Sequence, residues 1–271
     1  SEVYSRARAI FERAGYGLTE TVVNAAFFDT PQSRDRLILG GCLGETDGWL
    51  TEYLDQYKSP QPMTVADVLG PDFGTCFEEF ALDAACRDAV SEDDAGYTSY
   101  RLRERDLQRL SERNPGTRFY YCSPGGASSG AIHRTDRPSP TLIRTSTDRL
   151  SKNYRPLRGD PVDLRKLAQP TFRQFSRLAG YPEWWEWKLG GNEENSCAFG
   201  DSAIGRSRQQ MLANSVPPPL ALAIGRAIVD HACKKLPTRQ PGLKSAEEWR
   251  MKPGELKRYK RWLEVAKQLE G

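Results

Sequence analysis

The spacing of apolar residues at the start of the chain predicts an α/β structure. Apolar side chains recur at helical spacing over residues 4–15, where Gly15 and Gly17 end the pattern. A short apolar run at 21–23 and a buried run at 36–40 then predict two strands. A helix followed by two strands is typical of an α/β sheet.

The centre and the end of the chain show different patterns. The centre is irregular, and its spacing predicts short helices at 64–69, 76–90 and 101–113 and short strands at 117–122 and 141–145. The later part predicts helices at 170–180, 206–213, 217–231 and 245–269. Three consecutive prolines open the helix at 217–231, and proline is tolerated only in a first helical turn.

The composition is that of a soluble globular protein, with 38% hydrophobic and 28% charged residues. No uninterrupted apolar run approaches the roughly 18 residues that a membrane span requires. The first residues lack the charged and apolar pattern of a secretory signal. We therefore expect a cytoplasmic protein of a prokaryote or its phage, associated with the nucleoid if it binds DNA.

The formal net charge of +3 conceals a strong asymmetry along the chain. Residues 41–96 hold 13 acidic against 2 basic side chains, whereas residues 97–173 hold 16 basic against 7 acidic ones. The tail, residues 234–271, holds 11 basic against 5 acidic side chains. Fourteen of the 16 bases in the central segment are arginines, whose planar fork suits phosphates and guanine edges. This pattern favours nucleic-acid binding, and a solvated charged surface is the alternative.

The spacing of metal-binding residues gives no indication of a metal site. The six cysteines form no CxxC pair, and the chain has only two histidines, His133 and His231. Zinc sites and disulfide frameworks usually show closely spaced ligands or paired cysteines. We therefore expect reduced, partly buried cysteines and no metal.

Three segments, in the same order, resemble the last three conserved blocks of the bacterial DNA (cytosine-5) methyltransferases. Residues 24–36 resemble the eighth block, with a Pro-Gln-x-Arg-x-Arg core. Residues 164–182 resemble the ninth block, which ends in Gly-Tyr-Pro, and residues 210–221 resemble the tenth, Asn-Ser-Val-Pro-Pro. Shorter matches at 64–69 and 137–141 lie between them, so the resemblance spans residues 5–231.

The resemblance implies an α/β fold, a partial S-adenosylmethionine-dependent methyltransferase (Rossmann-like) sheet, with a small irregular α+β target recognition domain. The implied organisation follows the three blocks. Residues 1–41 would form the edge of the catalytic domain, 42–163 the target recognition domain, 164–205 the ninth block and hinge, 206–233 the returning helix, and 234–271 a basic helical tail.

The resemblance also implies roles in base flipping, which exposes a cytosine for methylation. Arg36 would contact the flipped cytosine and a phosphate, and Arg34 and Gln32 would brace the site. Arg34 and Arg36 alternate along an extended segment and should share a face.

The tenth block implies contact with S-adenosyl-L-methionine through Asn214, Ser215 and Val216. A helix start can hold a carboxylate through free amides, and capping of the helix is the alternative role for Asn214 and Ser215. The family usually has glycine where this chain has Ala213.

A loop of small residues at 123–137 would bind double-stranded DNA. It contains His133, Arg134 and Arg137, and Arg144 follows in the next predicted strand. Arginine in a groove reads guanine, and a surface loop is the alternative. Trp184, Trp185 and Trp187 are expected in the core of the small domain.

The chemistry of the family requires a cysteine thiolate that attacks the cytosine ring, and that cysteine follows a proline. No cysteine in this sequence follows a proline, and the Phe-x-Gly-x-Gly and Glu-Asn-Val blocks are missing too. We therefore expect the C-terminal half of a split methyltransferase, a heterodimer of the restriction-modification type. A second polypeptide would supply the nucleophile and share the cofactor. The alternative is a catalytically inactive, methyltransferase-derived DNA-binding module, and a piece of a longer protein would give the same sequence.

Overall fold

The computed structural model describes residues 2–82, 102–122, 130–143, 150, 154–187 and 203–235. The α-helices are α1 (Glu2–Arg13), α2 (Thr51–Asp55), α3 (Val65–Leu69), α4 (Phe77–Phe80), α5 (Glu104–Ser111), α6 (Phe172–Leu178), α7 (Ala203–Asn214) and α8 (Pro218–Ala232). The strands are β1 (Tyr16–Asn24), β2 (Asp35–Leu43), β3 (Thr75–Cys76), β4 (Arg118–Tyr121) and β5 (Ile132–Arg134). Two short 3-10 helices, η1 (Ala25–Phe27) and η2 (Leu164–Lys166), complete the described mixed α/β structure.

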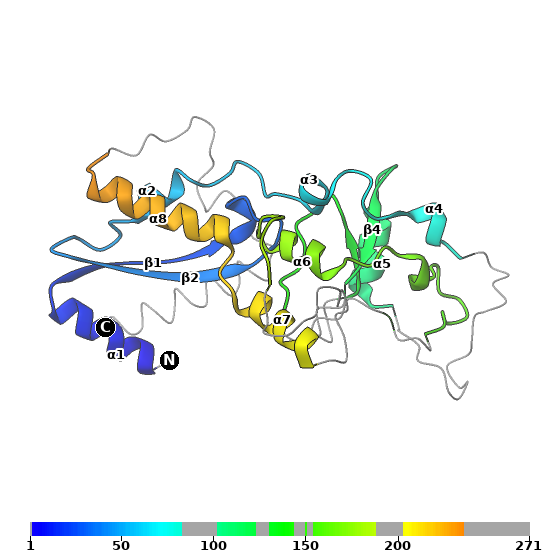
Figure 1. Cartoon of the computed structure of the whole chain (residues 1–271), viewed down its shortest axis with the longest axis horizontal. Coiled ribbons are helices and arrows are strands. Elements are labelled where there is room, and N and C mark those ends of the chain that lie inside the picture. The colour runs from blue at the N-terminus through cyan, green and yellow to red at the C-terminus, as the bar shows by residue number, and fades with distance from the viewer. Residues whose placement is uncertain are drawn as a thin grey trace.

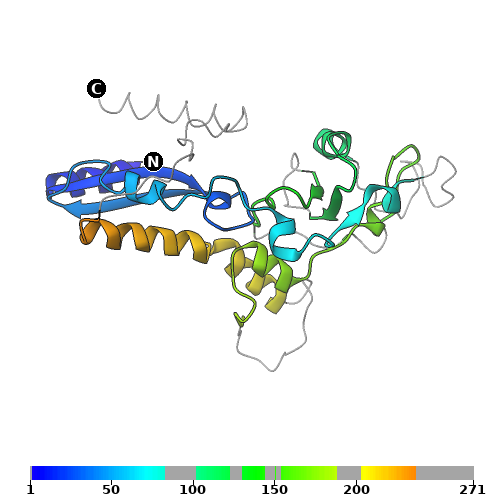
Figure 2. The same ribbon diagram turned by 90° about the horizontal axis from the view of Figure 1, so that it is seen from above.

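The first lobe is built on a long antiparallel hairpin. Strands β1 and β2 pair over their full length, from Tyr16 opposite Leu43 to Asn24 opposite Asp35. Helix α8 runs along the hairpin with α2 beside it, at one end of the elongated molecule (Figures 1 and 2). Leu220, Ala223 and Ala227 of α8 share a buried cluster with side chains of β1 and α2. Helix α1 packs on β1, where Phe11 meets the Tyr16 ring at 5.5 Å.

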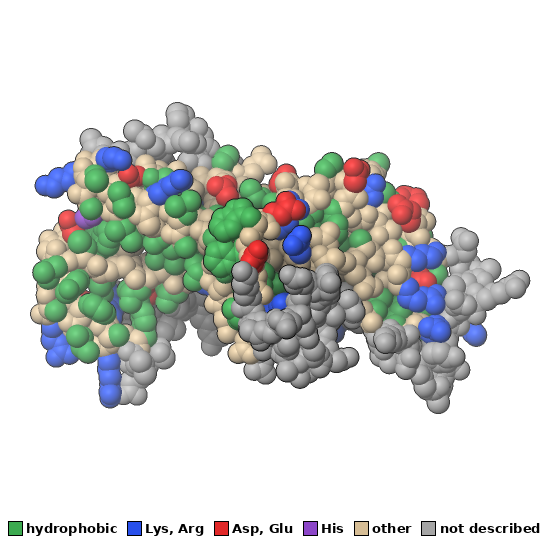
Figure 3. Space-filling view, viewed as in Figure 1, with side chains coloured by type: hydrophobic (Ala, Val, Ile, Leu, Met, Phe, Trp, Pro, Cys, Tyr) green, Lys and Arg blue, Asp and Glu red, His purple; other side chains and the backbone are tan. Residues whose placement is uncertain are grey.

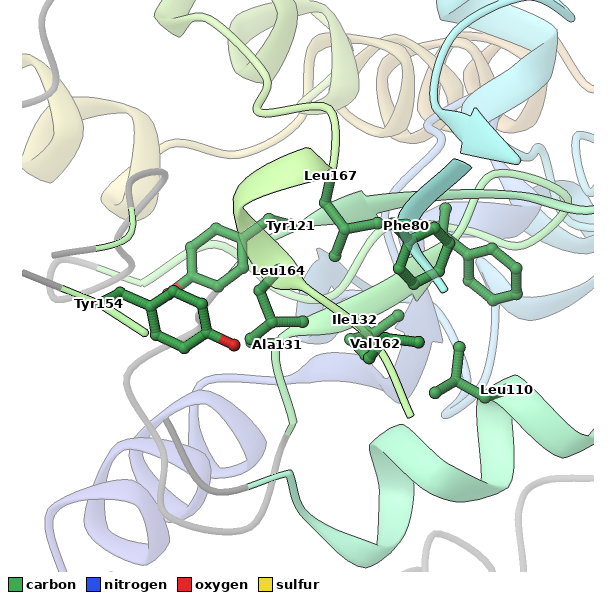
Figure 4. Close-up of a cluster of buried hydrophobic side chains, with 10 residues drawn as sticks. Phe80, Leu110, Tyr121, Ala131, Ile132, Tyr154, Val162, Leu164 and Leu167 are labelled. Carbon is green, nitrogen blue, oxygen red and sulfur yellow. The ribbon is translucent and has the colours of Figure 1, made fainter. Parts of the chain in front are cut away.

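The second lobe surrounds a small antiparallel sheet with the order β3-β4-β5. Alternate side chains of β4 and β5 face α4, α5 and η2 and form a buried cluster with them (Figure 4). Asp106 of α5 is fully buried and accepts the backbone N–H groups of Ala131 and Ile132 at 2.8 and 2.9 Å. This carboxylate therefore fastens α5 to the start of β5, because buried donors without partners would be costly.

A third cluster joins the two lobes through α3, α6 and α7. It buries Val65, Phe175 and Leu212, one from each helix, together with Tyr120 of β4. Thr64 begins α3 as predicted, since its hydroxyl and the Asp67 carboxylate form a capping box. In Figure 1, α6 and α7 lie between the hairpin and the small sheet.

These clusters cross two of the predicted domain boundaries. Strand β2 extends to Leu43, and Leu50 and Leu54 pack against α8, so the first lobe continues beyond residue 41. Leu164 and Leu167 lie in the core of the small sheet, although the sequence placed residue 164 in the next segment. Apolar burial decides both boundaries, and it is a tertiary property.

Several predicted elements differ in extent. Both hairpin strands are longer than their apolar runs, because strand pairing continues through the polar and glycine positions. The predicted helix at 76–90 is described only to Phe80, where Ala81 leaves helical geometry with ψ 143°. Residues 141–143 are not a strand. The predicted helix at 245–269 lies outside the described residues.

One helical run, Arg208–Ala232, is long and apolar enough by composition to cross a membrane. Ser215–Pro217 divide this run into α7 and α8, of 12 and 15 residues. Neither helix alone has the roughly 18 residues that a span requires. Leu220, Ala223 and Ala227 of α8 pack on the hairpin, whereas Leu222, Ile228 and Val229 are exposed.

Candidate functional site

The predicted arginine segment lies where the hairpin meets the rest of the chain. Residues 31–33 pair with the Pro-Ser-Pro-Thr segment at 138–141, part of the short match between the blocks. Ser33 N donates to Ser139 O and Ser139 N donates to Pro31 O, both at 2.8 Å. The Thr141 hydroxyl donates to Ser33 O at 2.6 Å. The resemblance singled out both segments, and only the structure shows that they pair side by side.

Arg34 lies at the centre of this junction and is only 2% exposed. Its guanidinium donates to the Leu142 and Ala213 carbonyl oxygens and to Gln32 Oε1. The planar fork of arginine can reach several acceptors at once. Arg34 therefore ties the start of β2 to the segment after Ser139 and to the end of α7.

Two buried donors in the junction have no acceptor among the described residues. They are Nε of Arg34 and Nε2 of Gln32, whose side chain is fully buried. Buried polar atoms are normally hydrogen-bonded, so these two donors are available to a water molecule or another group that enters the junction. The pair is suited to receive an acceptor such as a carboxylate or a carbonyl oxygen.

Arg36 is placed differently from its neighbour. Its side chain is half-buried and donates to the Asp35 carbonyl oxygen at 2.9 Å. Partial burial lowers the pKa of Arg36 from its ordinary value, and an arginine remains protonated at neutral pH. In β2 the even-numbered positions from Arg36 to Cys42 are less exposed than the odd-numbered ones, so they share one face.

Replacing Arg34 by alanine should destabilise the fold by about 3 kcal/mol, because the carbonyl groups of Leu142 and Ala213 would lose a buried charged donor. Arg34→Lys should also be destabilised, but less than the alanine variant, since a single ammonium cannot span both carbonyls. Arg36→Ala is the matched control and should change the free energy of unfolding by less than about 0.5 kcal/mol. Urea unfolding measures all three, and equal effects at both arginines would contradict the bracing role.

The tenth-block segment forms the connection between α7 and α8. Asn214 is the last residue of α7 and is exposed, and the Ser215 hydroxyl donates back to Leu212 O at 2.8 Å. The N-cap of α8 is Pro217, without a side-chain hydrogen bond. The alternative role, in which Asn214 and Ser215 cap the following helix, is therefore wrong.

The start of α8 also offers fewer amides than we expected. Residues 217–219 are all proline and carry no N–H group, so Leu220 supplies the first amide of the helix. The expected anion contact through free helix amides is therefore unavailable over these three positions. The exposed side chains of this connection are those of Asn214 and Val216, and Val216 is 49% exposed.

Ala213 replaces the family's usual glycine without strain. It lies inside α7, and among the described residues only Asp29 and Lys234 have positive φ outside glycine. Gly180 of the Gly-Tyr-Pro turn does need its freedom, with φ +87°. A Cβ there would lie 2.7 Å from Pro219 Cδ and 3.3 Å from the Thr30 hydroxyl. The three blocks therefore meet at one place.

Two of the predicted DNA-binding residues do not lie in a loop. His133 and Arg134 belong to β5 and are 6% exposed each. A ring nitrogen of His133 lies 2.9 Å from Cys122 O, and Arg134 makes two bonds with the Asp136 carboxylate and one with Glu112 O. The loop assignment was wrong because β5 pairs with β4, and the burial of both residues favours a structural role.

The remaining predicted DNA contacts have mixed outcomes. The Arg137 side chain is exposed, and its backbone carbonyl accepts Val65 N at 3.0 Å, which fixes its position next to α3. Arg144 lies outside the described residues, as does the small-residue loop at 123–129. A role for Arg137 in DNA binding stays a prediction.

The tryptophans after the Gly-Tyr-Pro turn divide into two kinds. Trp187 is partly buried, packs against the cluster of α3, α6 and α7, and donates to the Ser176 hydroxyl at 2.8 Å. Trp184 and Trp185 are 76% and 44% exposed. The predicted core position is confirmed for Trp187 and wrong for the other two.

The sequence did not identify the carbonyl groups of Leu142 and Ala213 as parts of the site. A backbone carbonyl gives no signal in residue type, and only the fold brings it to Arg34. The one available signal was that Leu142 follows the short match at 137–141.

The comparison with solved structures gives matches of low similarity. The S. pombe Dnmt2 methyltransferase has a TM-score of 0.46 and 15% identity, covering 86% of this chain and 63% of that chain. The Entamoeba histolytica methyltransferase EhMeth has a TM-score of 0.41 and 12% identity, covering 87% of this chain and 59% of that one.

Two curated proteins match most of the chain. The Type II methyltransferase M.PspPI of Psychrobacter sp. (strain TA137) is 29% identical over 233 residues, which are 81% of this chain and 48% of that protein. The Type II methyltransferase M.HindV of Haemophilus influenzae is 26% identical over 230 residues, 84% of this chain and 56% of that protein. The chain thus spans about half the length of these relatives. The family model for C-5 cytosine-specific DNA methylases matches residues 3–230, so the chain belongs to that family.

Proposed function

We propose that this chain forms the base-holding and DNA-recognising part of a DNA (cytosine-5) methyltransferase. A second polypeptide supplies the nucleophilic cysteine, the ring-binding glutamate and the main S-adenosylmethionine loop. The observation that carries this proposal is the junction around Arg34, which ties the eighth block to the tenth and contains two buried donors without an acceptor among the described residues. Gly180 of the ninth block packs against Thr30 and Pro219 of the same two blocks. A domain that only reads DNA has no need of such a junction.

Each part of the junction has a role in this proposal. Arg36 holds the flipped cytosine and a nearby phosphate from its half-buried position on β2. Gln32 and Arg34 present their free donors to an acidic or carbonyl group of the completed site. The connection of Asn214, Ser215 and Val216 forms one wall of the cofactor pocket, held in place through Ala213. S-adenosylmethionine supplies the methyl group when it is bound.

The surface of the hairpin supports completion by a second polypeptide. Within the described chain β2 pairs only with β1, so its outer edge has no strand partner there. The hairpin face on which α1 lies carries four exposed apolar side chains, which we call the apolar sheet face: Val22, Leu37, Leu39 and Leu43. Exposed apolar side chains also gather over the hairpin and α8 in Figure 3. An unpaired edge beside a broad apolar surface is typical of an incomplete sheet.

A charge placed on the apolar sheet face should weaken association with the second polypeptide. Leu39→Lys should raise the dissociation constant about 100-fold, because burial of a leucine contributes roughly 1.5–3 kcal/mol and a buried lysine adds a penalty. The isolated chain should keep its fold, since Leu39 is partly exposed and lies opposite Glu20. Isothermal titration with the proposed second polypeptide, the one that would carry the Pro-Cys block, measures the effect.

Leu107→Lys is the matched control for this measurement. Leu107 is 47% exposed on α5, in the other lobe. It should leave the dissociation constant unchanged. Equal weakening by both substitutions, or no weakening by Leu39→Lys, would contradict docking through the hairpin.

A further inference from the structure

A cysteine, a glutamate and a histidine meet at the far end of the hairpin from Arg36. Cys42 lies on β2, Glu45 lies in the turn that follows, and His231 lies in the last turn of α8. Their potential ligand atoms all lie within 4.8 Å of one another. His231 lies 189 positions after Cys42 in the sequence. The spacing of potential metal ligands along the chain therefore gave no indication of this group.

Local packing positions the backbone of the Cys42–Glu45 segment and the ring of His231. Glu45 N donates to Cys42 O at 3.4 Å, which closes the turn, and a Cβ on Gly17 would lie 2.2 Å from Glu45 O. The turn is therefore packed directly on β1. The imidazole of His231 is flanked by the rings of Trp49 and Tyr53, at centroid distances of 4.5 and 5.3 Å.

One separation between the ligand atoms already matches what a tetrahedral cation requires. His231 Nε2 and Glu45 Oε1 are 3.3 Å apart. Two ligands bound at about 2.0–2.1 Å with a tetrahedral angle are separated by roughly 3.4 Å. A sulfur and a nitrogen ligand would be roughly 3.5 Å apart. Because the three ligand atoms now lie within 4.8 Å of one another, the thiol has to move by at most about 1.3 Å.

We propose that Cys42, Glu45 and His231 bind one borderline divalent transition-metal cation such as Zn²⁺. Sulfur, nitrogen and oxygen ligands together favour zinc or cobalt over magnesium or calcium. The thiolate and the carboxylate neutralise the charge of the ion, and the thiol releases its proton on binding. Water fills the fourth position. The ion fastens the end of α8 to the end of β2, about 20 Å along the strand from Arg36.

Titration of the purified 271-residue chain with Co²⁺ tests this site, because thiolate–cobalt bonds give an intense near-ultraviolet absorption band. We expect the band to saturate at about one Co²⁺ per chain. Cys42→Ser should abolish the band, and His231→Gln should raise the dissociation constant at least about tenfold through the loss of one ligand. Excess Zn²⁺ should displace the cobalt and raise the melting temperature of the wild-type chain.

Cys233→Ser is the matched control, because Cys233 is an exposed thiol just after α8 and is not one of the three ligands. It should retain the band. Absence of the band in the wild type, its retention in Cys42→Ser, or its loss in Cys233→Ser would each overturn the proposed ligand set. Circular dichroism of each variant separates loss of a ligand from loss of folding.

Discussion

The isolated chain is expected to transfer no methyl group to duplex DNA, and addition of the second polypeptide is expected to restore transfer. The family's chemistry needs a thiolate at the cytosine ring. Cys42 lies six residues along β2 from Arg36, about 20 Å away at the rise of a strand, and Cys122 is buried. Neither can attack a base that Arg36 holds.

Transfer of a tritiated methyl group from S-adenosylmethionine to mixed-sequence DNA measures this outcome. The two polypeptides are assayed separately and together at equal protein concentration. Substitution of the proline-linked cysteine in the second polypeptide is the control, and it should abolish transfer by the pair. Methyl transfer by the isolated chain would refute the split arrangement while leaving family membership intact.

Arg36→Ala is expected to lower the turnover of the completed enzyme about 100-fold, as loss of one preorganised charged donor commonly does. The chain should still fold and still bind DNA, because within the described residues Arg36 donates a hydrogen bond only to its neighbour Asp35. The loss should therefore fall mainly on kcat. Arg36→Lys should recover part of it, since the charge remains but the fork geometry is lost.

Arg137→Ala is the matched comparison for Arg36→Ala. Its exposed position favours a phosphate contact, so its removal should raise KM and reduce the salt dependence of DNA binding, with little change in kcat. Steady-state kinetics at two salt concentrations separate the two arginines. Unchanged turnover of Arg36→Ala would refute the role given to Arg36.

Much of the first lobe could be predicted from sequence, because local patterns specify it. Helical spacing located α1 and α8, and the apolar runs at 21–23 and 36–40 located the hairpin strands. The extension of β2 to Leu43 could not be predicted in this way. Its glycines and Cys42 gain their strand geometry from pairing with β1.

The candidate site divides along the same line. The sequence pattern identified Gln32, Arg34 and Arg36 as site residues. It did not show that Arg34 is buried and holds two segments together, whereas Arg36 is half-buried. The 2% exposure of Arg34 follows from the segments at Leu142 and Ala213, which lie 108 and 179 positions further along the chain. His133 and Arg134 were placed in a loop because their three-residue strand is too short to show a period.

By itself, the sequence determined the family, the order of its three blocks and the residue types that they carry, because these are properties of neighbouring positions. Only the tertiary structure decided which of those residues are buried, which carbonyl groups Arg34 holds, and that His231 meets Cys42 and Glu45. Such contacts join segments far apart in the chain. They depend on how apolar faces pack, and no local pattern records that.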